Sequence, residues 1–183
     1  ASLLADADAD VIAWNGTSAS WLGIDRDKTL CEAITARTGA PATTSTLASI
    51  DAVGALGAAR VGFVTPYIDD VQTRIGEVWK QAGIACHAER HLRLRDNFSF
   101  GEVPPATIAE MIRAVAGEGA DAVVVLCTNL DGAALAASLE SELGIVVLDS
   151  VAVTLWRTME LAGADPRMLS GWGRIFQTTA RAN

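Results

Sequence analysis

The sequence predicts an α/β fold of two pseudo-symmetric lobes, each a short parallel sheet flanked by helices. Short apolar runs alternate with segments of helical periodicity, which is typical of strand–helix–strand units and a parallel sheet. The run Asp121–Leu126 reads DAVVVL, as expected for a strand buried on both faces of such a sheet. One strand–loop–helix unit also occurs twice along the chain.

In residues 1–58, which we assign to the first lobe, predicted strands and helices alternate. Gly39 follows the first periodic stretch as a helix C-cap, and Ser45 is placed to cap the next helix at its N-terminus. The predicted elements are the strand Val11–Trp14, the helix Asp27–Thr38, the extended piece Pro41–Thr43 and the helix Ser45–Leu56.

Residues 59–150, assigned to the second lobe, continue the same alternation. Asp69 and Asp70 suit the positive end of a helix dipole, and Pro104 and Pro105 suit the first turn of a helix. The predicted strands are Arg60–Val64, Ile84–Ala88, Asp121–Leu126 and Ile145–Leu148, the predicted helices are Val71–Ala82, Ala106–Ala116 and Leu130–Leu143, and His91–Gly101 is expected to be a loop.

Residues 151–183 are predicted to form a C-terminal helix and a tail that return to the first lobe. The helix spans Val151–Ala162, with Ser150 as its N-cap and Gly163 at its end. The tail from Asp165 onward is mixed and polar.

The repeated unit places two polar loops at equivalent strand ends. Ile12–Ser18 lines up with Val123–Asn129, and each copy continues through a helix to a glycine, Gly39 or Gly144. Because ligands of open parallel sheets bind at the carboxyl ends of the strands, we predict that both loops face one cleft between the lobes, which holds the active site. The alternative interpretation is a chance similarity between two buried strands with small polar loops.

The composition excludes several classes of partner and ligand. With 22 acidic against 14 basic residues the net charge is −8, whereas a nucleic-acid binder needs a basic surface. The longest uncharged apolar stretch, around Val123–Leu126, is far shorter than the ~20 residues of a membrane span. Three cysteines without paired spacing indicate a reducing compartment, so we expect a cytoplasmic protein, and a hydrophobic content of 50% allows a homodimer. His87 and His91 lack the further ligands of a zinc site, so no metal is predicted.

Cys127 is the candidate reactive residue. It follows a buried strand and precedes Thr128 and Asn129 at the predicted start of a helix, where backbone N–H groups lower the pKa of a thiol and attract a carboxylate. The alternative is a buried cysteine that packs as a small hydrophobe. Cys31, on a predicted helix, and Cys86, in a predicted strand, are interpreted as packing residues.

Two further strand ends offer hydrogen-bond donors. Gly16, Thr17 and Ser18 combine consecutive backbone N–H groups with two hydroxyls, which suits a carboxylate or another small anion. Tyr67, the only tyrosine, follows another strand. Its hydroxyl either donates to a substrate oxygen or caps the edge of the sheet.

Five stretches occur in an order and at a spacing typical of one enzyme superfamily. They are VIAWNGTSASWLG, TGAPATTSTLASIDAVGALGAARVGFVTPYIDDV, DAVVVLCTNL, LGIVVLDSVAVTLWRTMELAG and GWGRIF, which together cover most of the chain. The chain resembles the aspartate/glutamate racemase superfamily, in the branch of arylmalonate decarboxylase and maleate cis-trans isomerase. The stretch NFSFGEVPP is similar to the isomerase side of that branch.

The resemblance implies a cofactor-free enzyme with chemistry at the carbon next to a carboxylate. In the racemases and isomerases of this superfamily, each lobe supplies one cysteine. The second of these matches Cys127, but the first falls at Gly16, where the decarboxylase pattern also has a glycine. The resemblance therefore favours a decarboxylase, in which Cys127 protonates an enediolate.

The resemblance also implies which residues bind the substrate, a small carboxylate or dicarboxylate. One substrate carboxylate is expected to lie at Gly16, Thr17 and Ser18, with Tyr67 as a further donor. The turn from Cys127 into Thr128 would complete this oxyanion pocket.

Three functions stay open at the level of the sequence. The first is decarboxylation of a small substituted malonate or a related dicarboxylate. The second is maleate cis-trans isomerisation, or racemisation of an amino acid or hydantoin, which needs another base in place of a thiol at Gly16. The third is a non-catalytic carboxylate-binding protein. Superfamily members begin with a strand and a helix before the segment that matches Val11, so roughly sixty residues of the first lobe are expected to be absent. Either the chain is truncated, which we favour, or the first lobe is reduced.

Overall fold

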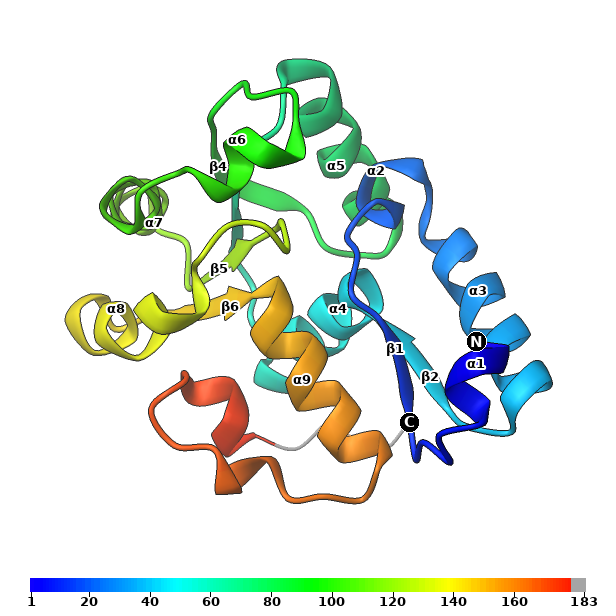
Figure 1. Ribbon diagram of the computed structural model, residues 1–183. Helices are drawn as coiled ribbons and strands as arrows, with labels where there is room; N and C mark the ends of the chain where they lie inside the picture. The colour runs from blue at the N-terminus through cyan, green and yellow to red at the C-terminus, as the bar shows by residue number, and fades with distance from the viewer. Residues whose placement is uncertain (179–183) are drawn as a thin grey trace.

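Two parallel sheets organise the structure (Figure 1). The computed structural model describes residues 1–178. The smaller sheet pairs β1 (Ile12–Trp14) with β2 (Ala42–Thr44). The larger sheet has the strand order β4-β3-β5-β6 and consists of β3 (Val61–Thr65), β4 (Cys86–His91), β5 (Ala122–Val125) and β6 (Val146–Asp149). Every neighbouring pair of strands is parallel, which confirms the predicted fold class.

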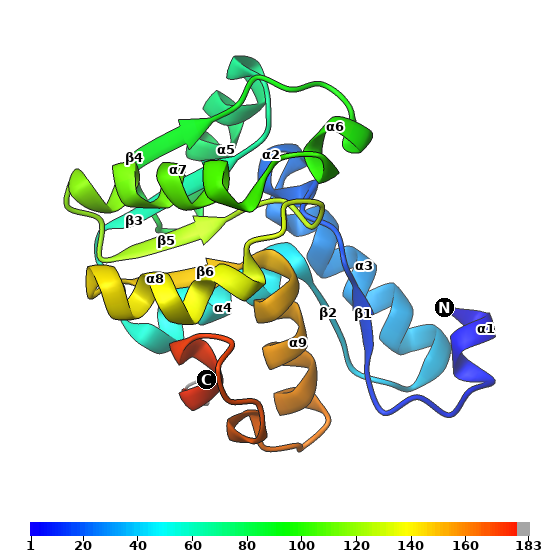
Figure 2. The ribbon, with the colours of Figure 1, turned by 60° about the vertical axis from the view of Figure 1, so that its left-hand side comes forward.

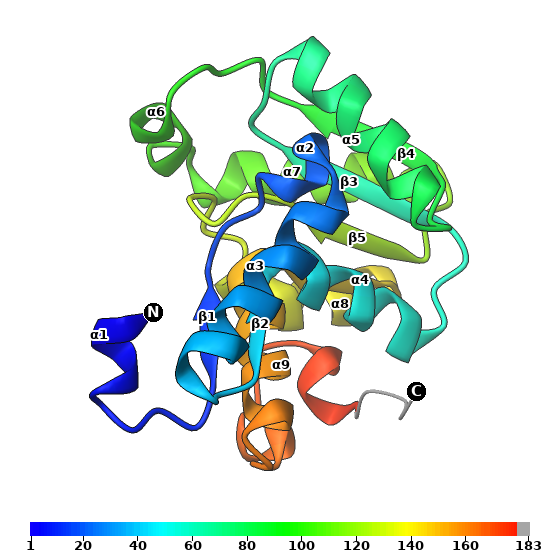
Figure 3. The ribbon, with the colours of Figure 1, turned by 90° about the vertical axis from the view of Figure 1, so that its right-hand side faces the viewer.

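The larger sheet is buried because helices lie on both sides of it (Figures 2 and 3). Its flanking helices are α4 (Ser45–Leu56), α5 (Asp69–Gln81), α7 (Pro105–Gly117) and α8 (Ala136–Leu143). α7 and α8 lie on one side, and α4 and α5 lie on the other. All residues of β3 and β5 are buried, which explains the apolar runs from Val61 to Val64 and from Ala122 to Val125. A Cβ at Gly62 would lie 2.1 Å from Cγ1 of Val115, so only glycine lets α7 pack this closely on β3.

Two further helices pack against the smaller sheet, and the order of the elements along the chain reflects the sequence repeat. α3 (Ile24–Thr38) and α9 (Ser150–Leu161) both contact β2, and α9 also packs along α4. The order β1-α3-β2-α4 is the same as the order β5-α8-β6-α9, as the repeat predicts. Gly39 and Gly144 end α3 and α8 with left-handed φ angles of 78° and 71°, which favour glycine at both positions.

Short elements complete the described part of the chain. They are α1 (Ser2–Ala5), α2 (Ala19–Leu22), α6 (Asn97–Gly101) and the 3-10 turns η1 (Ala133–Leu135), η2 (Pro166–Met168) and η3 (Arg174–Gln177). η2 and η3 pack against α9, and η3 also contacts β6. The last part of the predicted tail, residues 179–183, lies outside the described residues. No helix in residues 1–178 has the length and apolar character needed to cross a membrane.

Two helix caps differ from the sequence prediction by one residue. Thr44 rather than Ser45 caps α4, because the Thr44 side chain accepts a hydrogen bond from the Leu47 N–H at 3.2 Å. Asp149 rather than Ser150 caps α9, because its carboxylate accepts from two N–H groups of the first turn at 2.8 and 3.0 Å. Each serine is instead the first residue of its helix.

Two predictions between residues 84 and 101 are wrong. β4 begins at Cys86 rather than Ile84, because the Ile84 N–H closes the end of α5 by donating to the Trp79 carbonyl at 2.9 Å. The predicted loop contains the helix α6. Its N-cap is Asp96, whose carboxylate accepts from the Ser99 N–H at 3.0 Å.

Candidate active site

A cleft of about 510 Å³ lies where the carboxyl ends of β1, β3, β4 and β5 meet. Its lining includes every residue to which the sequence assigns a catalytic or substrate-binding role: Gly16, Thr17, Ser18, Tyr67, Cys127 and Thr128. The loops after β1 and β5 carry five of them, and the sixth follows β3. The structure therefore brings residues from distant parts of the chain into one cleft, and their chemical roles stay predictions.

The two loops offer hydrogen-bond donors that the chain itself does not use. The Gly16 N–H donates to the Trp14 carbonyl at 2.9 Å, which turns the chain at the end of β1. Among the described residues, the N–H groups of Thr17, Ser18 and Thr128 have no acceptor. The hydroxyls of Ser18 and Thr128 likewise have no partner within residues 1–178. Unused donors of this kind suit an anionic ligand.

Tyr67 is held by both its hydroxyl and its ring. The hydroxyl lies 3.0 Å from Oγ1 of Thr17, and the ring packs against Trp21 and Phe100 with centroid distances of 4.9 and 5.4 Å. Burial and the neighbouring Cys127 raise the pKa of Tyr67 far above its ordinary value, so the phenol stays protonated. One hydrogen bond joins the Tyr67 and Thr17 hydroxyls and uses one of their two protons, and the Tyr67 hydroxyl also interacts with the Cys127 thiol.

Cys127 is buried at the start of the loop after β5, with 4% of its surface exposed. Its N–H donates to Oγ of Ser150 at 3.1 Å, and its Sγ accepts from the Asn129 N–H at 3.4 Å. The predicted start of the next helix at Leu130 is wrong. The Leu130 N–H donates to the Cys127 carbonyl at 3.1 Å and closes a turn, and helical structure begins only at Ala133.

The Cys127 thiol has a raised pKa, contrary to the expectation of a lowered one. Burial raises this pKa, and it outweighs the opposing effect of hydrogen bonds with Asn129, Tyr67 and Leu130. The charge of Asp149 raises the pKa further. A thiol that stays protonated at neutral pH can act as a proton donor, whereas a nucleophile or base needs the thiolate.

Asp149 is a buried carboxylate beside Ser150 at the start of α9, and 1% of its surface is exposed. Its Oδ2 atom has no hydrogen-bond partner among the described residues. A Cβ at Gly132 would lie 2.9 Å from this oxygen, so the absence of a side chain there lets the loop after β5 pass close to the carboxylate. Burial raises the pKa of Asp149 to about 6, although the N–H groups of Ala152 and Val151 lower it.

The substitution Asp149→Asn is expected to remove a pH dependence of stability. The folded state raises the pKa from 3.8 to about 6, so it binds the proton more tightly, and stability falls as the pH rises through this window. A shift of this size corresponds to roughly 3 kcal/mol. Asparagine also caps helices, so the variant keeps an acceptor for the first turn of α9. In urea unfolding, the free energy of unfolding of the variant should increase relative to that of the wild type as the pH rises from about 4 to about 7.

Asp96→Asn is the matched control for this prediction. Asp96 also caps a helix, but it is exposed, and hydrogen bonds from Ser99 lower its pKa. Its contribution to stability is present above its ordinary pKa of 3.8 and is lost only as the pH falls below that value. The difference in unfolding free energy between this variant and the wild type should therefore stay constant between about pH 4 and about pH 7. Parallel pH profiles of the Asp149→Asn variant and the wild type would contradict the role of this carboxylate.

Part of the cleft lining was not predictable from the sequence. Trp14, 54% exposed, and Trp21 both line the cleft, although the scattered tryptophans gave no sign of this. Phe100 and Asn97 come from α6, inside the segment predicted as a loop. Nδ2 of Asn129 donates to the Asn97 carbonyl at 3.0 Å and ties α6 to the loop after β5. The capping carboxylate before α6 is the sequence signal that would have revealed this helix.

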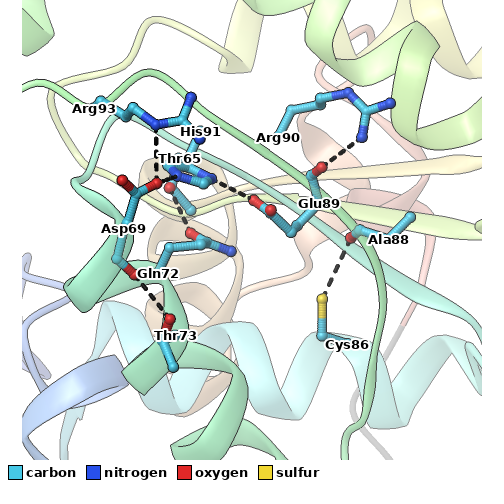
Figure 4. Close-up of polar contacts among 10 residues, drawn as sticks. All are labelled: Thr65, Asp69, Gln72, Thr73, Cys86, Ala88, Glu89, Arg90, His91 and Arg93. Carbon is cyan, nitrogen blue, oxygen red and sulfur yellow. Dashed lines mark hydrogen bonds and ion pairs between the residues drawn. The ribbon is translucent and has the colours of Figure 1, made fainter.

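The two histidines do not line the cleft. Nε2 of His91 lies 2.6 Å from Asp69, and its Nδ1 lies 2.7 Å from Glu89 (Figure 4). Nε2 of His87 lies 3.1 Å from the Glu118 carbonyl. In the part of the chain that the structure describes, no group of three or more histidine, cysteine, aspartate or glutamate side chains could hold a metal ion.

Comparisons with known proteins agree with the resemblance in the sequence. The family model of arylmalonate decarboxylase matches residues 1–176. Arylmalonate decarboxylase of Bordetella bronchiseptica is 30% identical over 171 residues, which are 92% of this chain and 71% of the relative. A maleate isomerase of Geobacillus stearothermophilus is 26% identical over 130 residues, which are 69% of this chain and 52% of that relative. The chain therefore spans about half the length of that isomerase.

A solved structure supports the same assignment. It is a liganded arylmalonate decarboxylase with one Gly-to-Cys and one Cys-to-Ser substitution. This structure matches 96% of the present chain and 76% of its own, with a TM-score of 0.89 and 26% identity. The family match over nearly the whole chain and the agreement in fold lead to one conclusion: this chain belongs to the arylmalonate decarboxylase family.

Proposed function

We propose that this protein is a cofactor-independent decarboxylase of a small substituted malonate, with Cys127 as its proton donor. The substrate class comes from arylmalonate decarboxylase, which the chain matches over 92% of its length. The cleft supports this class in two ways. Two loops supply unused donors for a carboxylate, and no carboxylate side chain lines the cleft within the described residues.

The observation that carries the proposal is that Cys127 has no second thiol opposite it. Its equivalent in the first repeat is Gly16, and a Cβ there would lie 2.6 Å from Nε1 of Trp14. Cys31 and Cys86 do not line the cleft. Racemisation through two thiols needs one on each side of the substrate, whereas a decarboxylase needs a proton from one side only.

In the proposed reaction, one substrate carboxylate accepts hydrogen bonds from Thr17, Ser18, Tyr67 and Thr128. The second carboxylate lies against apolar side chains, where the loss of its hydration favours the departure of neutral CO2. The carbon–carbon bond to this carboxylate breaks, and its electron pair stays on the substrate as an enediolate, which the hydrogen bonds stabilise.

Cys127 then transfers its thiol proton to the carbanion carbon, and the resulting thiolate regains a proton from water. The scheme uses only side chains and backbone groups of this chain, with no organic cofactor or metal. A donor thiol must stay reduced, which agrees with the expected cytoplasmic location.

Maleate cis-trans isomerisation is the second candidate. The match to maleate isomerase over 69% of the chain favours it. In that reaction a thiolate adds to the double bond, but the first-repeat position is Gly16, and burial raises the pKa of Cys127. The glycine at position 16 and the raised pKa of Cys127 also argue against racemisation of an amino acid or hydantoin. A non-catalytic carboxylate-binding protein would keep the cleft without turnover.

Proton NMR in D₂O distinguishes these candidates. Phenylmalonate and maleate are each incubated with the protein and, as a control, without it. The proposal predicts protein-dependent release of CO2 and formation of phenylacetate deuterated next to its carboxylate, with maleate unchanged. Formation of fumarate without CO2 would establish the isomerase instead. Binding of malonate without turnover of either compound would support the binding protein and contradict the decarboxylase.

A further inference from the structure

Arg95 is the one charged residue in the cleft lining within the described part of the chain. The chain has a net charge of −8, and arginines such as Arg113 and Arg157 pair with carboxylates. Arg95 forms no hydrogen bond or ion pair with any of residues 1–178. An unpaired guanidinium beside a cleft that no carboxylate among residues 1–178 lines is suited to bind an anionic group.

The backbone on both sides of Arg95 is fixed. On one side, three consecutive N–H groups donate to the segment that carries Tyr67. The Leu92 N–H donates to the Thr65 carbonyl at 3.2 Å, the Arg93 N–H to the Tyr67 carbonyl at 3.0 Å, and the Leu94 N–H to the Pro66 carbonyl at 2.8 Å. On the other side, Asp96 caps α6. Arg95 is therefore carried by a short segment that is anchored at both ends.

Arg93 has a left-handed backbone conformation directly before the two residues of this segment that line the cleft. Its φ angle of 60° is unfavourable for a residue with a side chain, and the turn is held by an ion pair between its Nε and Oδ1 of Asp69 at 2.9 Å (Figure 4). His91 lies against the same carboxylate, so two side chains of this segment anchor on it. Leu94 and Arg95 follow this turn and line the cleft. Backbone strain that surrounding contacts maintain is typical of functional sites.

We infer that Arg95 binds an anionic group of the substrate that takes no part in the reaction. This inference rests on the proposed function and narrows its substrate class to malonates whose substituent carries a carboxylate or another anion. The retained carboxylate has its own donors at Thr17 and Ser18. An arginine on the departing carboxylate would stabilise the ground state and slow the loss of CO2, so that group is a poor partner for Arg95. A third anionic group, remote from the reacting carbon, has no other donors assigned to it, and its binding does not slow the loss of CO2.

The first test compares phenylmalonate with a phenylmalonate that carries a carboxylate on its ring. The wild type is expected to prefer the ring carboxylate, and Arg95→Gln should reduce the ratio of kcat/KM values by about 10- to 100-fold, mainly through KM. Arg95→Lys should recover part of the preference, because lysine keeps the charge but loses the forked geometry. Arg74→Gln is the matched control, since Arg74 is exposed on α5 and does not line the cleft.

Calorimetry with unreactive ligands separates this inference from the proposed function. Tricarballylate and glutarate differ by one carboxylate. The wild type should bind tricarballylate more tightly, Arg95→Gln should lose this difference, and Arg74→Gln should keep it. If no malonate is turned over but the difference depends on Arg95, the decarboxylase proposal fails and the anion site stands. If phenylmalonate is decarboxylated but Arg95→Gln leaves both preferences unchanged, the inference about Arg95 is overturned.

Discussion

Cys127→Ala is expected to lower kcat for malonate decarboxylation by at least about 10²-fold. The thiol is buried at the cleft and stays protonated at neutral pH, because burial raises its pKa. Alanine removes this proton donor but keeps the N–H that donates to Ser150, so the loop after β5 should hold its shape. The rate of CO2 release at saturating phenylmalonate measures the effect.

Cys86→Ala is the control for this experiment. Cys86 is a half-buried free thiol at the amino end of β4, and its Sγ donates to the Ala88 carbonyl at 3.5 Å. Its removal deletes the same atom away from the cleft and should leave kcat unchanged. Thermal unfolding of both variants establishes that they are folded. A folded Cys127→Ala variant with the kcat of the wild type would contradict proton transfer from this thiol.

Tyr67→Phe and Thr17→Val are each expected to lower kcat/KM by about 10²-fold. Phenylalanine keeps the ring that packs against Trp21 and Phe100, and valine keeps the shape of threonine, so each change removes one hydroxyl. Without that hydroxyl, the enediolate loses hydrogen-bond stabilisation. Because the two hydroxyls are bonded to each other at 3.0 Å, the double variant should lose less than the product of the two single effects.

Thr158→Val is the matched control for the hydroxyl deletions. The Thr158 hydroxyl donates to the Thr154 carbonyl at 2.7 Å on α9, and Thr158 does not line the cleft. Its variant should keep the kcat/KM of the wild type. If the Tyr67 and Thr17 variants are folded and equally active, these hydroxyls do not stabilise the charge that develops in the reaction.

Much of the fold follows from local patterns in the sequence. The run from Ala122 to Leu126 is apolar throughout because β5 is buried on both faces, and this pattern identifies a central parallel strand without any tertiary information. The exact N-cap of a helix is harder to predict from the sequence, because in this chain two residues that can cap a helix stand next to each other. Thr44 and Ser45 are both good caps, as are Asp149 and Ser150, and only the backbone geometry decides which of each pair lies outside the helix.

The candidate site was predictable where it follows the strand ends. The repeat identified the loops that carry Gly16 and Cys127, because equivalent strands of a parallel sheet present their carboxyl ends to the same cleft. The direction of the pKa shift at Cys127 was not predictable, since it depends on the burial of the thiol, which results from tertiary packing. The place of Arg95 in the cleft lining was not predictable either, because an exposed arginine in a polar segment has the same sequence pattern whether or not it faces a cleft.

The configuration of the product from a prochiral malonate tests the role of Cys127 most directly. Methylphenylmalonate loses CO2 to give a carbanion with two faces, and a single thiol on one side of the cleft can protonate only one of them. The wild-type protein should therefore give one enantiomer of 2-phenylpropanoate in large excess, as measured by chiral chromatography. A racemic product formed at a protein-dependent rate would contradict proton delivery from Cys127.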